Sequence, residues 1–253
     1  MTIGIDLAGK TALVTGGSRG LGAEMCRTLA KAGAAVAVHY AQNRAGAEAV
    51  AQSLRDGGAR AAVVHGDFHV QSEVEHAVAD AVRQLGPIDI LVNNVGREEE
   101  LGPALSLDWS AYAGIIELNL RSAYCTSRAV VPHMQEQRWG RIINILSMAA
   151  HQYPKGMSPY SAAKNALRSF TQSLAVELGP DNITVNAVSP GWIPVERHGP
   201  ASLPGRMATA ARTPLGHLGT AADVAGAVLY FASDLANFIT GVEIPVCGGV
   251  HLL

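Results

Sequence analysis

A tyrosine and a lysine form the part of this sequence best suited to chemistry. Tyr160 and Lys164 are four residues apart in a helical pattern, so both side chains project from one face of the helix. A phenol has a pKa of about 10, and proton transfer near neutral pH requires a decrease equivalent to about 4 kcal/mol. An ammonium at about 5 Å provides about 3 kcal/mol when the effective dielectric constant is near 20. Lys164 is therefore nearly sufficient to make Tyr160 a general acid or base.

A serine upstream adds a hydroxyl group to this pair. Ser147 follows a short apolar segment, thirteen residues before Tyr160. Ligands of open α/β sheets bind beyond the carboxyl ends of the strands, which is where we expect Ser147. Taken alone, Tyr160 and Lys164 are more typical of an exposed helix pair with an extended lysine. Ser147 and a glycine cluster near the N-terminus favour the catalytic interpretation.

The glycine cluster is the segment 15–22, with the sequence TGGSRGLG. Gly16, Gly20 and Gly22 lie between a predicted strand and a predicted helix, where the chain must turn sharply. The free N–H groups and partial positive charge of a helix N-terminus attract phosphate, and glycine lets phosphate approach the backbone. The cluster therefore predicts a dinucleotide-binding turn rather than a generic glycine turn, although its spacing differs from G-x-G-x-x-G.

The elements that would position these residues alternate along the whole chain. The expected strands are short and apolar, as parallel strands buried on both faces are: Thr11–Thr15, Ala35–His39, Ala61–Val64, Ile88–Val92, Arg141–Leu146, Ile183–Val188 and Val242–Val246. The expected helices are Leu21–Ala32, Arg44–Arg55, Ser72–Leu85, Trp109–Gln137, Pro159–Leu178 and Ala221–Phe231. This order predicts an α/β protein with a doubly wound parallel sheet of about seven strands and helices on both faces. We expect a single domain over residues 1–253, with an irregular substrate loop or lid over 191–220.

Taken together, these motifs resemble the short-chain dehydrogenase/reductase family over essentially the whole chain, and within it the 3-oxoacyl-ACP reductase-like branch. The matching positions, in the order and spacing of the family, are Thr15, Gly16, Gly20 and Gly22; Asn93–Gly96, with Val95 in place of alanine; Asn119; Ser147; Tyr160 and Lys164; and Pro190–Gly191. The resemblance implies a Rossmann-like fold and an NADP(H)- or NAD(H)-dependent oxidoreductase.

The resemblance also implies roles for four residues. Tyr160 would exchange a proton with the substrate oxygen, Ser147 would hydrogen-bond that oxygen, and Lys164 would lower the pKa of Tyr160 and bind the nicotinamide ribose. Asn119 would position a water in a proton relay, although a helix-interior asparagine satisfied by the backbone is the alternative. We expect interconversion of a ketone or aldehyde and an alcohol. The alternatives are an NAD-dependent sugar or polyol dehydrogenase and a non-catalytic dinucleotide-binding sensor.

The end of the second strand bears on the choice of cofactor. The acid that usually binds the ribose diol of NAD is missing from the segment 38–44, whereas Arg19 and Arg44 lie close to it in sequence. Positive charge without a carboxylate favours the 2′-phosphate of NADP(H), unless both arginines are solvated surface charges. The expected cofactor contacts are Gly16, Ser18, Arg19, Gly20, Leu21, Gly22, Tyr40, Asn43, Arg44, Asp67, Phe68, Asn94, Val95, Gly96, Tyr160, Lys164, Pro190, Gly191 and Ile193. Asp67 resembles the aspartate with which the family contacts adenine, and a helix or turn cap is the alternative.

Several other residues carry weaker predictions. The segment between Ser147 and Tyr160 and the start of the lid suggest four substrate contacts, namely Met148, His151, Tyr153 and Trp192. Two further residues of the lid, His198 and Arg206, either contact the substrate or are solvated. Val195 replaces the threonine that the family often carries, and Cys247 replaces an aspartate. His65 and His69 straddle a strand end, so no metal site is expected.

Composition excludes several classes of protein. Apolar residues make up 48% and charged residues 16%, which is below the roughly 25% of average domains and predicts a large buried fraction. The net charge of −2 without charged runs argues against nucleic acid and anionic membranes as partners. No signal peptide or membrane span is expected, and three scattered cysteines indicate a reducing, cytoplasmic setting. The family resemblance implies a small-molecule substrate and, together with the low share of charged residues, a homotetramer in which helices 109–137 and 159–178 pair across a two-fold axis.

Overall fold

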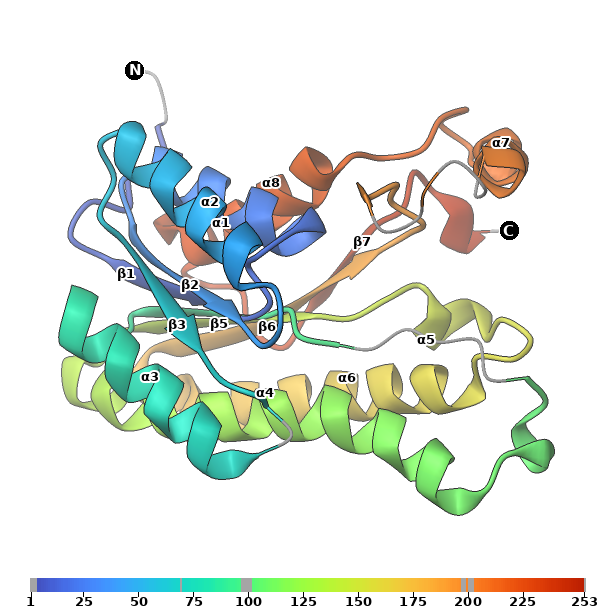
Figure 1. Ribbon diagram of the computed structural model, residues 1–253, viewed down its shortest axis with the longest axis horizontal. Helices are drawn as coiled ribbons and strands as arrows, with labels where there is room; N and C mark the ends of the chain where they lie inside the picture. The colour runs from blue at the N-terminus through green and yellow to red at the C-terminus, as the bar shows by residue number, and fades with distance from the viewer. Residues whose placement is uncertain (1–3, 69, 97–101, 197–198, 200–202, 253) are drawn as a thin grey trace.

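The apolar segments form a seven-stranded parallel sheet in the computed structural model, which describes residues 4–68, 70–96, 102–196, 199 and 203–252 (Figure 1). The strands are β1 (Thr11–Val14), β2 (Ala35–Tyr40), β3 (Ala61–His65), β4 (Ile90–Asn93), β5 (Gly140–Ile145), β6 (Ile183–Pro190) and β7 (Glu243–Val246). Every residue of β1, β4, β5 and β6 is buried, as expected for parallel strands that are covered on both faces. The doubly wound parallel sheet predicted from the sequence is confirmed.

The strand order places a crevice beside the glycine cluster. The order is β3-β2-β1-β4-β5-β6-β7, so the chain runs outward from β1 to β3 and then crosses to β4 on the other side of β1. Val14 pairs in register with Val38 of β2 and with Val92 of β4, so these three strands end at the same level. A reversal of this kind opens a crevice beyond the carboxyl ends of β1 and β4, where ligands of such sheets bind.

Helices cover both faces of the sheet in two layers (Figure 1). One layer contains α1 (Gly20–Lys31), α2 (Arg44–Asp56) and α8 (Ala221–Ala232), with α1 packed on α8. The other contains α3 (Gln71–Leu85), α4 (Trp109–Gln137) and α6 (Ser158–Leu178), with α4 packed on α6. None of the helices in the described part of the chain combines the length and apolar character needed to cross a membrane.

Two apolar cores separate the sheet from its helix layers. Ala12 and Val14 of β1 pack into the core beneath α1 and α8, together with the fully buried Phe231. Leu13, between them, faces the opposite core with Met134 of α4. This alternation follows from the two-residue period of a strand and holds β1 at the centre of the molecule.

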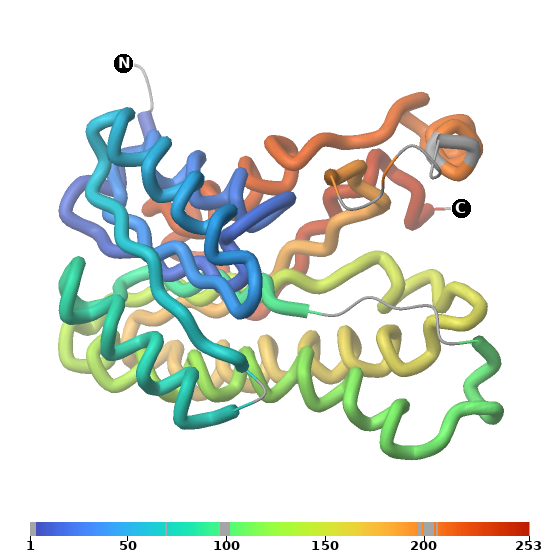
Figure 2. The backbone as a smooth tube through the Cα atoms, viewed as in Figure 1, coloured from blue at the N-terminus to red at the C-terminus, as the bar shows by residue number. Residues whose placement is uncertain are grey.

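The segment 191–220 is more regular than expected, because it contains α7 (Leu203–Arg212). The prolines of this segment suggested an irregular loop. Pro204, however, lies in the first turn of α7, where proline is tolerated, and the segment from Met207 to Arg212 contains good helix formers. A four-residue helix, α5 (Ala149–Gln152), also follows Ser147. Figure 2 shows α7 at the same side of the molecule as the carboxyl ends of β6 and β7.

Candidate active site

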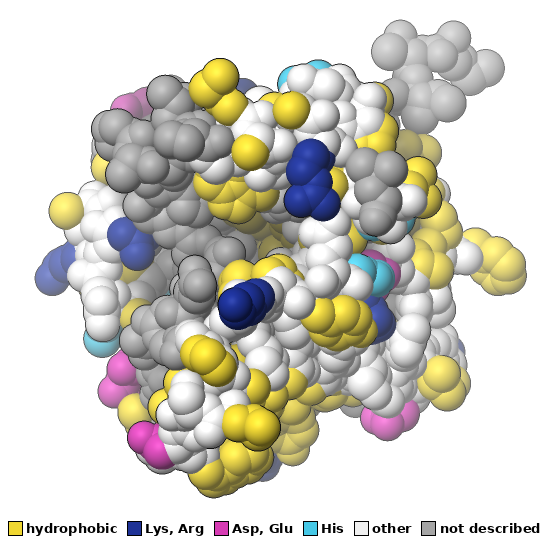
Figure 3. Space-filling view, turned by 90° about the vertical axis from the view of Figure 1, so that its right-hand side faces the viewer, with side chains coloured by type: hydrophobic (Ala, Val, Ile, Leu, Met, Phe, Trp, Pro, Cys, Tyr) yellow, Lys and Arg dark blue, Asp and Glu magenta, His cyan; other side chains and the backbone are white. Residues whose placement is uncertain are grey.

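A cleft of about 590 Å³ lies beyond the carboxyl ends of the strands. Figure 3 faces this side of the molecule and shows a hollow near its centre. The glycine turn, the ends of β2, β4, β5 and β6, and helix α6 contribute the walls of the cleft. Its described lining includes Gly16, Ser18, Arg19, Gly20, Leu21, Gly22, Tyr40, Asn43, Asn94, Val95, Gly96, Ser147, Tyr160, Lys164, Pro190, Gly191, Trp192 and Ile193. Most of the residues predicted from the sequence are therefore brought together.

Helix α6 presents Tyr160 and Lys164 to this cleft from a buried position. Tyr160 is 7% exposed and Lys164 is 2% exposed. The Lys164 ammonium lies 5.5 Å from the centroid of the Tyr160 ring and donates a hydrogen bond of 2.9 Å to the carbonyl oxygen of Ile145. The helical spacing of four residues thus places the ammonium beside the phenol, and the last residue of β5 holds it there.

Ser147 approaches the same cleft from the end of β5. Its Oγ accepts a hydrogen bond of 3.1 Å from the backbone N–H of Ala149, at the start of α5. A hydroxyl oxygen that accepts in this way still carries its own proton for donation. A phenol, an ammonium and a hydroxyl from two elements therefore line one cleft, as an acid–base site requires.

Gly96 determines how closely the chain approaches Asn119 and Lys164. A Cβ atom at position 96 would lie 2.6 Å from Oδ1 of Asn119 and 3.0 Å from Nζ of Lys164, so a larger residue would displace both groups. Asn119 is fully buried in α4, and its Nδ2 donates a hydrogen bond of 2.9 Å to the carbonyl of Ile115. Asn119 is not among the described lining residues of the cleft. It adjoins the Lys164 ammonium, however, because both side chains border the space beside Gly96.

The glycine turn fits a phosphate group by its backbone. Gly16 and Gly20 have φ values of 66° and 55°, which favour glycine, and a Cβ at Gly22 would lie 2.2 Å from the Gly16 oxygen. Arg19 precedes α1 in extended conformation, and no side chain in the described part of the chain caps the helix. The first N–H groups of α1 thus meet the cleft with the positive end of the helix dipole behind them.

Asn94 and Thr15 fasten this turn to β4. The Thr15 hydroxyl accepts hydrogen bonds from the backbone N–H groups of Asn94 and Val95 at 2.8 and 3.0 Å. The Asn94 amide donates in return to the carbonyl oxygens of Thr15 and Gly16 at 2.9 and 3.3 Å. The two loops on either side of the crevice therefore form one hydrogen-bonded unit.

The residues predicted for the adenosine half of the cofactor divide into two groups. Asn43 lines the cleft, caps α2 by accepting from the Gly46 N–H at 3.1 Å, and donates to the carbonyl of Ser18 at 3.5 Å. Arg44 is exposed, pairs with Glu48 at 3.9 Å and is absent from the described lining. Asp67 and Phe68 also lie outside that lining. The Asp67 N–H donates a hydrogen bond of 2.7 Å to the Glu73 carboxylate, and the Phe68 side chain is buried.

His39 is a lining residue that the sequence reasoning did not single out. It ends the buried part of β2 and is only 1% exposed. Its Nδ1 accepts from the Gly16 N–H at 3.0 Å, and its Nε2 lies 2.9 Å from the Gly66 carbonyl. Burial lowers the pKa of His39 to about 4. The missing acid at the end of β2 is visible in the sequence as a difference in charge. The hydrogen bonds of a neutral histidine ring leave no pattern in the sequence, so the role of His39 could not be predicted from it.

Of the four weaker substrate candidates, only Trp192 lines the cleft. Met148 is buried, and Tyr153 is 64% exposed. His151 points to β7, with Nε2 2.6 Å from the Glu243 carboxylate. The helical turn of α5 redirects these side chains, which a linear sequence between Ser147 and Tyr160 does not indicate. His198 and the Arg206 side chain lie outside the described residues.

His65 and Cys247, two further residues considered in the sequence, lie outside the described lining of the cleft. The described residues contain no group of three potential metal ligands, and His69 is not among them. The Cys247 sulfur lies 3.1 Å from Nδ1 of His251, and a Cβ at Gly191 would lie 2.9 Å from the Cys247 Cβ.

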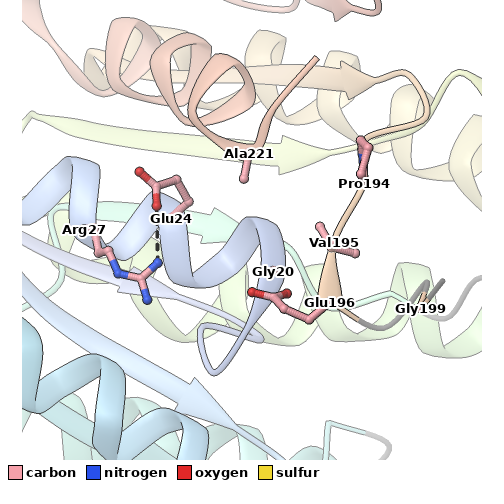
Figure 4. A pocket seen from close by; sticks show the side chains of 8 residues that line it. All are labelled: Gly20, Glu24, Arg27, Pro194, Val195, Glu196, Gly199 and Ala221. Atoms are coloured by element: carbon pink, nitrogen blue, oxygen red, sulfur yellow. Dashed lines mark hydrogen bonds and ion pairs between the residues drawn. The ribbon is translucent and has the colours of Figure 1, made fainter. Parts of the chain in front are cut away.

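A second cavity of about 520 Å³ lies beside the first (Figure 4). Val195 and Glu196 line both cavities, so this segment forms a wall between them.

Comparisons with known proteins agree with this geometry. Residues 16–251 match the family model described as enoyl-(acyl carrier protein) reductase. The chain is 38% identical over 250 residues to the 3-oxoacyl-(acyl-carrier-protein) reductase FabG of Pseudomonas aeruginosa, covering 98% of this chain and 100% of that protein.

Solved structures of similar fold include two dehydrogenases. The gluconate 5-dehydrogenase of Burkholderia cenocepacia, in complex with NADP and tartrate, has a TM-score of 0.90 and 29% identity, with 98% of this chain and 97% of that chain covered. A putative short-chain alcohol dehydrogenase of Sinorhizobium meliloti has a TM-score of 0.91 and 32% identity, with 97% of each chain covered. The chain therefore belongs to the short-chain dehydrogenase/reductase family and is an oxidoreductase that acts between CH–OH and C=O groups.

Proposed function

We propose that this protein is an NADP(H)-dependent oxidoreductase that interconverts a ketone or aldehyde and the corresponding alcohol, with Tyr160 as the general acid and base. The observation that carries the proposal is the convergence of Ser147, Tyr160 and Lys164 on one cleft that also contains the glycine turn. A non-catalytic sensor would need the glycine turn but not this group of three polar side chains.

The mechanism assigns one task to each side chain. Tyr160 donates its proton to the carbonyl oxygen during reduction and removes the hydroxyl proton during oxidation. The Lys164 ammonium, 5.5 Å from the phenol ring, favours the ionised form of Tyr160 by charge attraction. Ser147 donates a hydrogen bond to the same substrate oxygen. When bound, the nicotinamide dinucleotide supplies or accepts the hydride.

Asn119 and the lid complete the proposal for the reaction. Asn119 adjoins the Lys164 ammonium across Gly96, which supports a role for Asn119 in positioning the water of a proton relay. The segment 191–220 would form the lid over the substrate. Beside the Pro190–Gly191 turn, the described lining residues that it contributes are Trp192, Ile193, Val195 and Glu196. Substrate closure by such loops excludes water from the reacting groups.

The choice of NADP(H) over NAD(H) rests on the charge at the adenosine end. Arg19 lines the cleft, and the lining residues from the end of β2, which run from His39 to Asn43, contain no carboxylate. An arginine without a competing acid suits a 2′-phosphate. The similar gluconate 5-dehydrogenase structure holds NADP, which supports the same choice here. We expect Arg19→Ala to lower kcat/KM for NADPH by about tenfold or more, with little effect on NADH.

The free cysteines support an intracellular, cytoplasmic setting for this activity. Cys26, Cys125 and Cys247 are buried thiols without a disulfide. Buried unpaired thiols are typical of proteins in reducing compartments.

The experiment that tests the function is a turnover screen with NADPH and NADH against carbonyl compounds. The panel contains 3-oxoacyl thioesters, keto acids of sugars and simple ketones, because the relatives act on acyl and gluconate substrates by name. We expect consumption of NADPH with at least one class. Tyr160→Phe should lower kcat by about 10²- to 10⁴-fold and leave NADPH binding intact.

Two results would contradict the proposal. Tight NADPH binding without turnover across the whole panel would favour the sensor. Equal or better turnover with NADH would overturn the assignment of the cofactor and favour the sugar or polyol dehydrogenase.

A further inference from the structure

The imidazole of His39 connects the glycine turn, which lines the cleft, to the β3–α3 loop behind it. It lies at the end of β2, with the glycine turn on one side and the loop between β3 and α3 on the other. Its Nδ1 accepts a hydrogen bond of 3.0 Å from the Gly16 N–H, and its Nε2 is 2.9 Å from the Gly66 carbonyl oxygen. The side chain is 1% exposed, so both bonds are shielded from water.

These two partners determine the protonation state of the ring. The Gly16 N–H needs a lone pair on Nδ1, and the Gly66 oxygen needs a proton on Nε2. The ring is therefore the neutral Nε2–H tautomer. Burial lowers its pKa to about 4, while His65 on β3 and Asp67 in the following loop act on it in opposite directions. The imidazole thus stays neutral in the neutral pH range.

Packing and backbone bonds fix the position of this ring. The ring stacks on Phe68, with centroids 3.8 Å apart and planes inclined by 22°. The backbone on both sides is also tied down, since Gly17 N–H donates to the His39 carbonyl at 2.8 Å and Gly66 N–H donates to Tyr40 at 3.2 Å. The ring is consequently a rigid spacer rather than a flexible lining side chain.

We propose that His39 is a positioning residue for the dinucleotide, which holds the phosphate-binding turn and the β3–α3 loop at a fixed separation before the cofactor binds. The inference rests on the proposed function and deepens it. Gly16 has a φ of 66°, its N–H is bonded to the His39 ring and the Gly17 N–H is bonded to the His39 carbonyl, so the first N–H groups of α1, which no described side chain caps, are those left for the cofactor. A binding loop ordered in advance gives tighter binding, because less conformational freedom is lost on association.

Two variants separate the contributions of the ring. In His39→Asn, the amide oxygen replaces Nδ1 as acceptor for Gly16, but the shorter side chain cannot reach Gly66. In His39→Phe, stacking on Phe68 remains and both hydrogen bonds are lost. The Kd of NADPH, measured by calorimetry on the complete protein, should rise about tenfold or more in His39→Phe and by a smaller factor in His39→Asn. The KM for NADPH should rise in parallel, while kcat at saturating NADPH changes less than about threefold.

The controls distinguish positioning from a general loss of stability. His76 on α3 is exposed and outside the described cleft lining, so His76→Asn should leave the Kd of NADPH unchanged. The melting temperature of each variant is measured without cofactor. In protein labelled with ¹⁵N-histidine, the His39 ring should show the Nε2–H tautomer without NADPH and stay neutral down to pH 5.

Each outcome decides between the proposals. If both variants melt earlier but bind NADPH with the Kd of the unchanged protein, His39 is only structural and the inference is wrong. An Nδ1–H tautomer or a charged ring at pH 7 would also overturn it. If His39→Phe does not fold, His39→Asn alone must show the weaker binding. If the unchanged protein does not bind NADPH, the proposed function fails, whatever the variants do.

Discussion

Backbone atoms hold two of the side chains that we propose to take part in the reaction. The Ile145 carbonyl holds the Lys164 ammonium, and the Ala149 N–H holds Ser147 Oγ. Gly96 has no Cβ atom and therefore leaves room for the side chains of Asn119 and Lys164. At this scale the chemistry depends on positions of a few tenths of an ångström, and substitutions that barely alter stability can alter rate.

Gly96→Ala tests this dependence. The new Cβ would lie 2.6 Å from Asn119 Oδ1 and 3.0 Å from Lys164 Nζ. Both atoms end side chains that can shift, so we expect a change in unfolding free energy below about 1 kcal/mol but a fall in kcat of about 10- to 100-fold. Gly114→Ala is the matched control in α4, because nothing lies within 4 Å of its Cβ. An unchanged kcat in Gly96→Ala would show that the space at Gly96 has no role in catalysis.

The pH dependence of stability is a second prediction at this scale. Burial lowers the pKa of His39 from 6.5 to about 4, so the unfolded chain binds this proton more tightly. The contribution is fully present above pH 6.5, is lost progressively as the pH falls below that value, and is gone once the pH is below the folded-state value of about 4. Between pH 7 and 5 the unchanged protein should lose about 2 kcal/mol of unfolding free energy relative to His39→Asn.

Urea denaturation at several pH values measures this difference. His39→Asn serves as the reference for the unchanged protein, because the two proteins share all their other titrating groups. Parallel pH curves for the two proteins would contradict the buried neutral state of the imidazole.

At the scale of elements, one carboxylate ties together the segments that carry the site. Glu243 on β7 accepts hydrogen bonds from Ser189 at the end of β6 and from His151 in α5, and pairs with Arg168 of α6 at 2.8 Å. Ser189 directly precedes the Pro190–Gly191 turn, and Arg168 lies one helical turn beyond Lys164. Burial acts to raise the pKa of Glu243, but hydrogen bonds from His151 and Ser189 and the charge of Arg168 leave it below its ordinary value.

Glu243→Gln should therefore destabilise the protein and disturb the site together. We expect a loss of about 1–3 kcal/mol in unfolding free energy, because Arg168 loses its charged partner in a half-buried position. Asp80→Asn, which breaks an exposed pair with Arg83 on α3, should change the unfolding free energy by less than about 0.5 kcal/mol. Urea denaturation compares the two variants. Equal small effects would show that this cluster is no more than a surface network.

At the scale of the whole molecule, charged residues are few, and some large apolar side chains are exposed on the surface. Helices α4 and α6 pack together on one face of the sheet and still expose Tyr124 by 49% and Val176 by 79%. Apolar surface of this kind on paired helices is typical of subunit contacts. We propose a homotetramer in which these two helices pair with their copies across a two-fold axis.

Light scattering at micromolar concentration tests the assembly. We expect a mass four times the chain mass of 26.4 kDa. Val176→Glu should reduce the mass without unfolding the chain, because this side chain is exposed in the single chain. Val82→Glu on α3, at a residue 38% exposed, should leave the assembly intact. A single-chain mass for the unchanged protein would refute the proposed tetramer.

The sequence determined the sheet, the glycine turn and the candidate acid–base residues, because each rests on local physics. Apolar runs without alternation indicate strands buried on both faces, and a spacing of four places Tyr160 and Lys164 on one side of a helix. The predicted strands agree with the observed ones to within two residues at each end, and the helix α7 was missed because prolines masked a helix-forming segment.

Only the tertiary structure decided which residues meet at the carboxyl edge of the sheet. It brought His39 to Gly16, turned His151 away to Glu243, and left Arg44 on the surface with Glu48. The contacts of His39 and His151 join segments that are 23 and 92 residues apart in sequence, so they depend on how different elements are placed relative to one another. Side-chain spacing within one element is fixed by its helical or extended period, whereas contacts between loops follow from packing of the whole sheet.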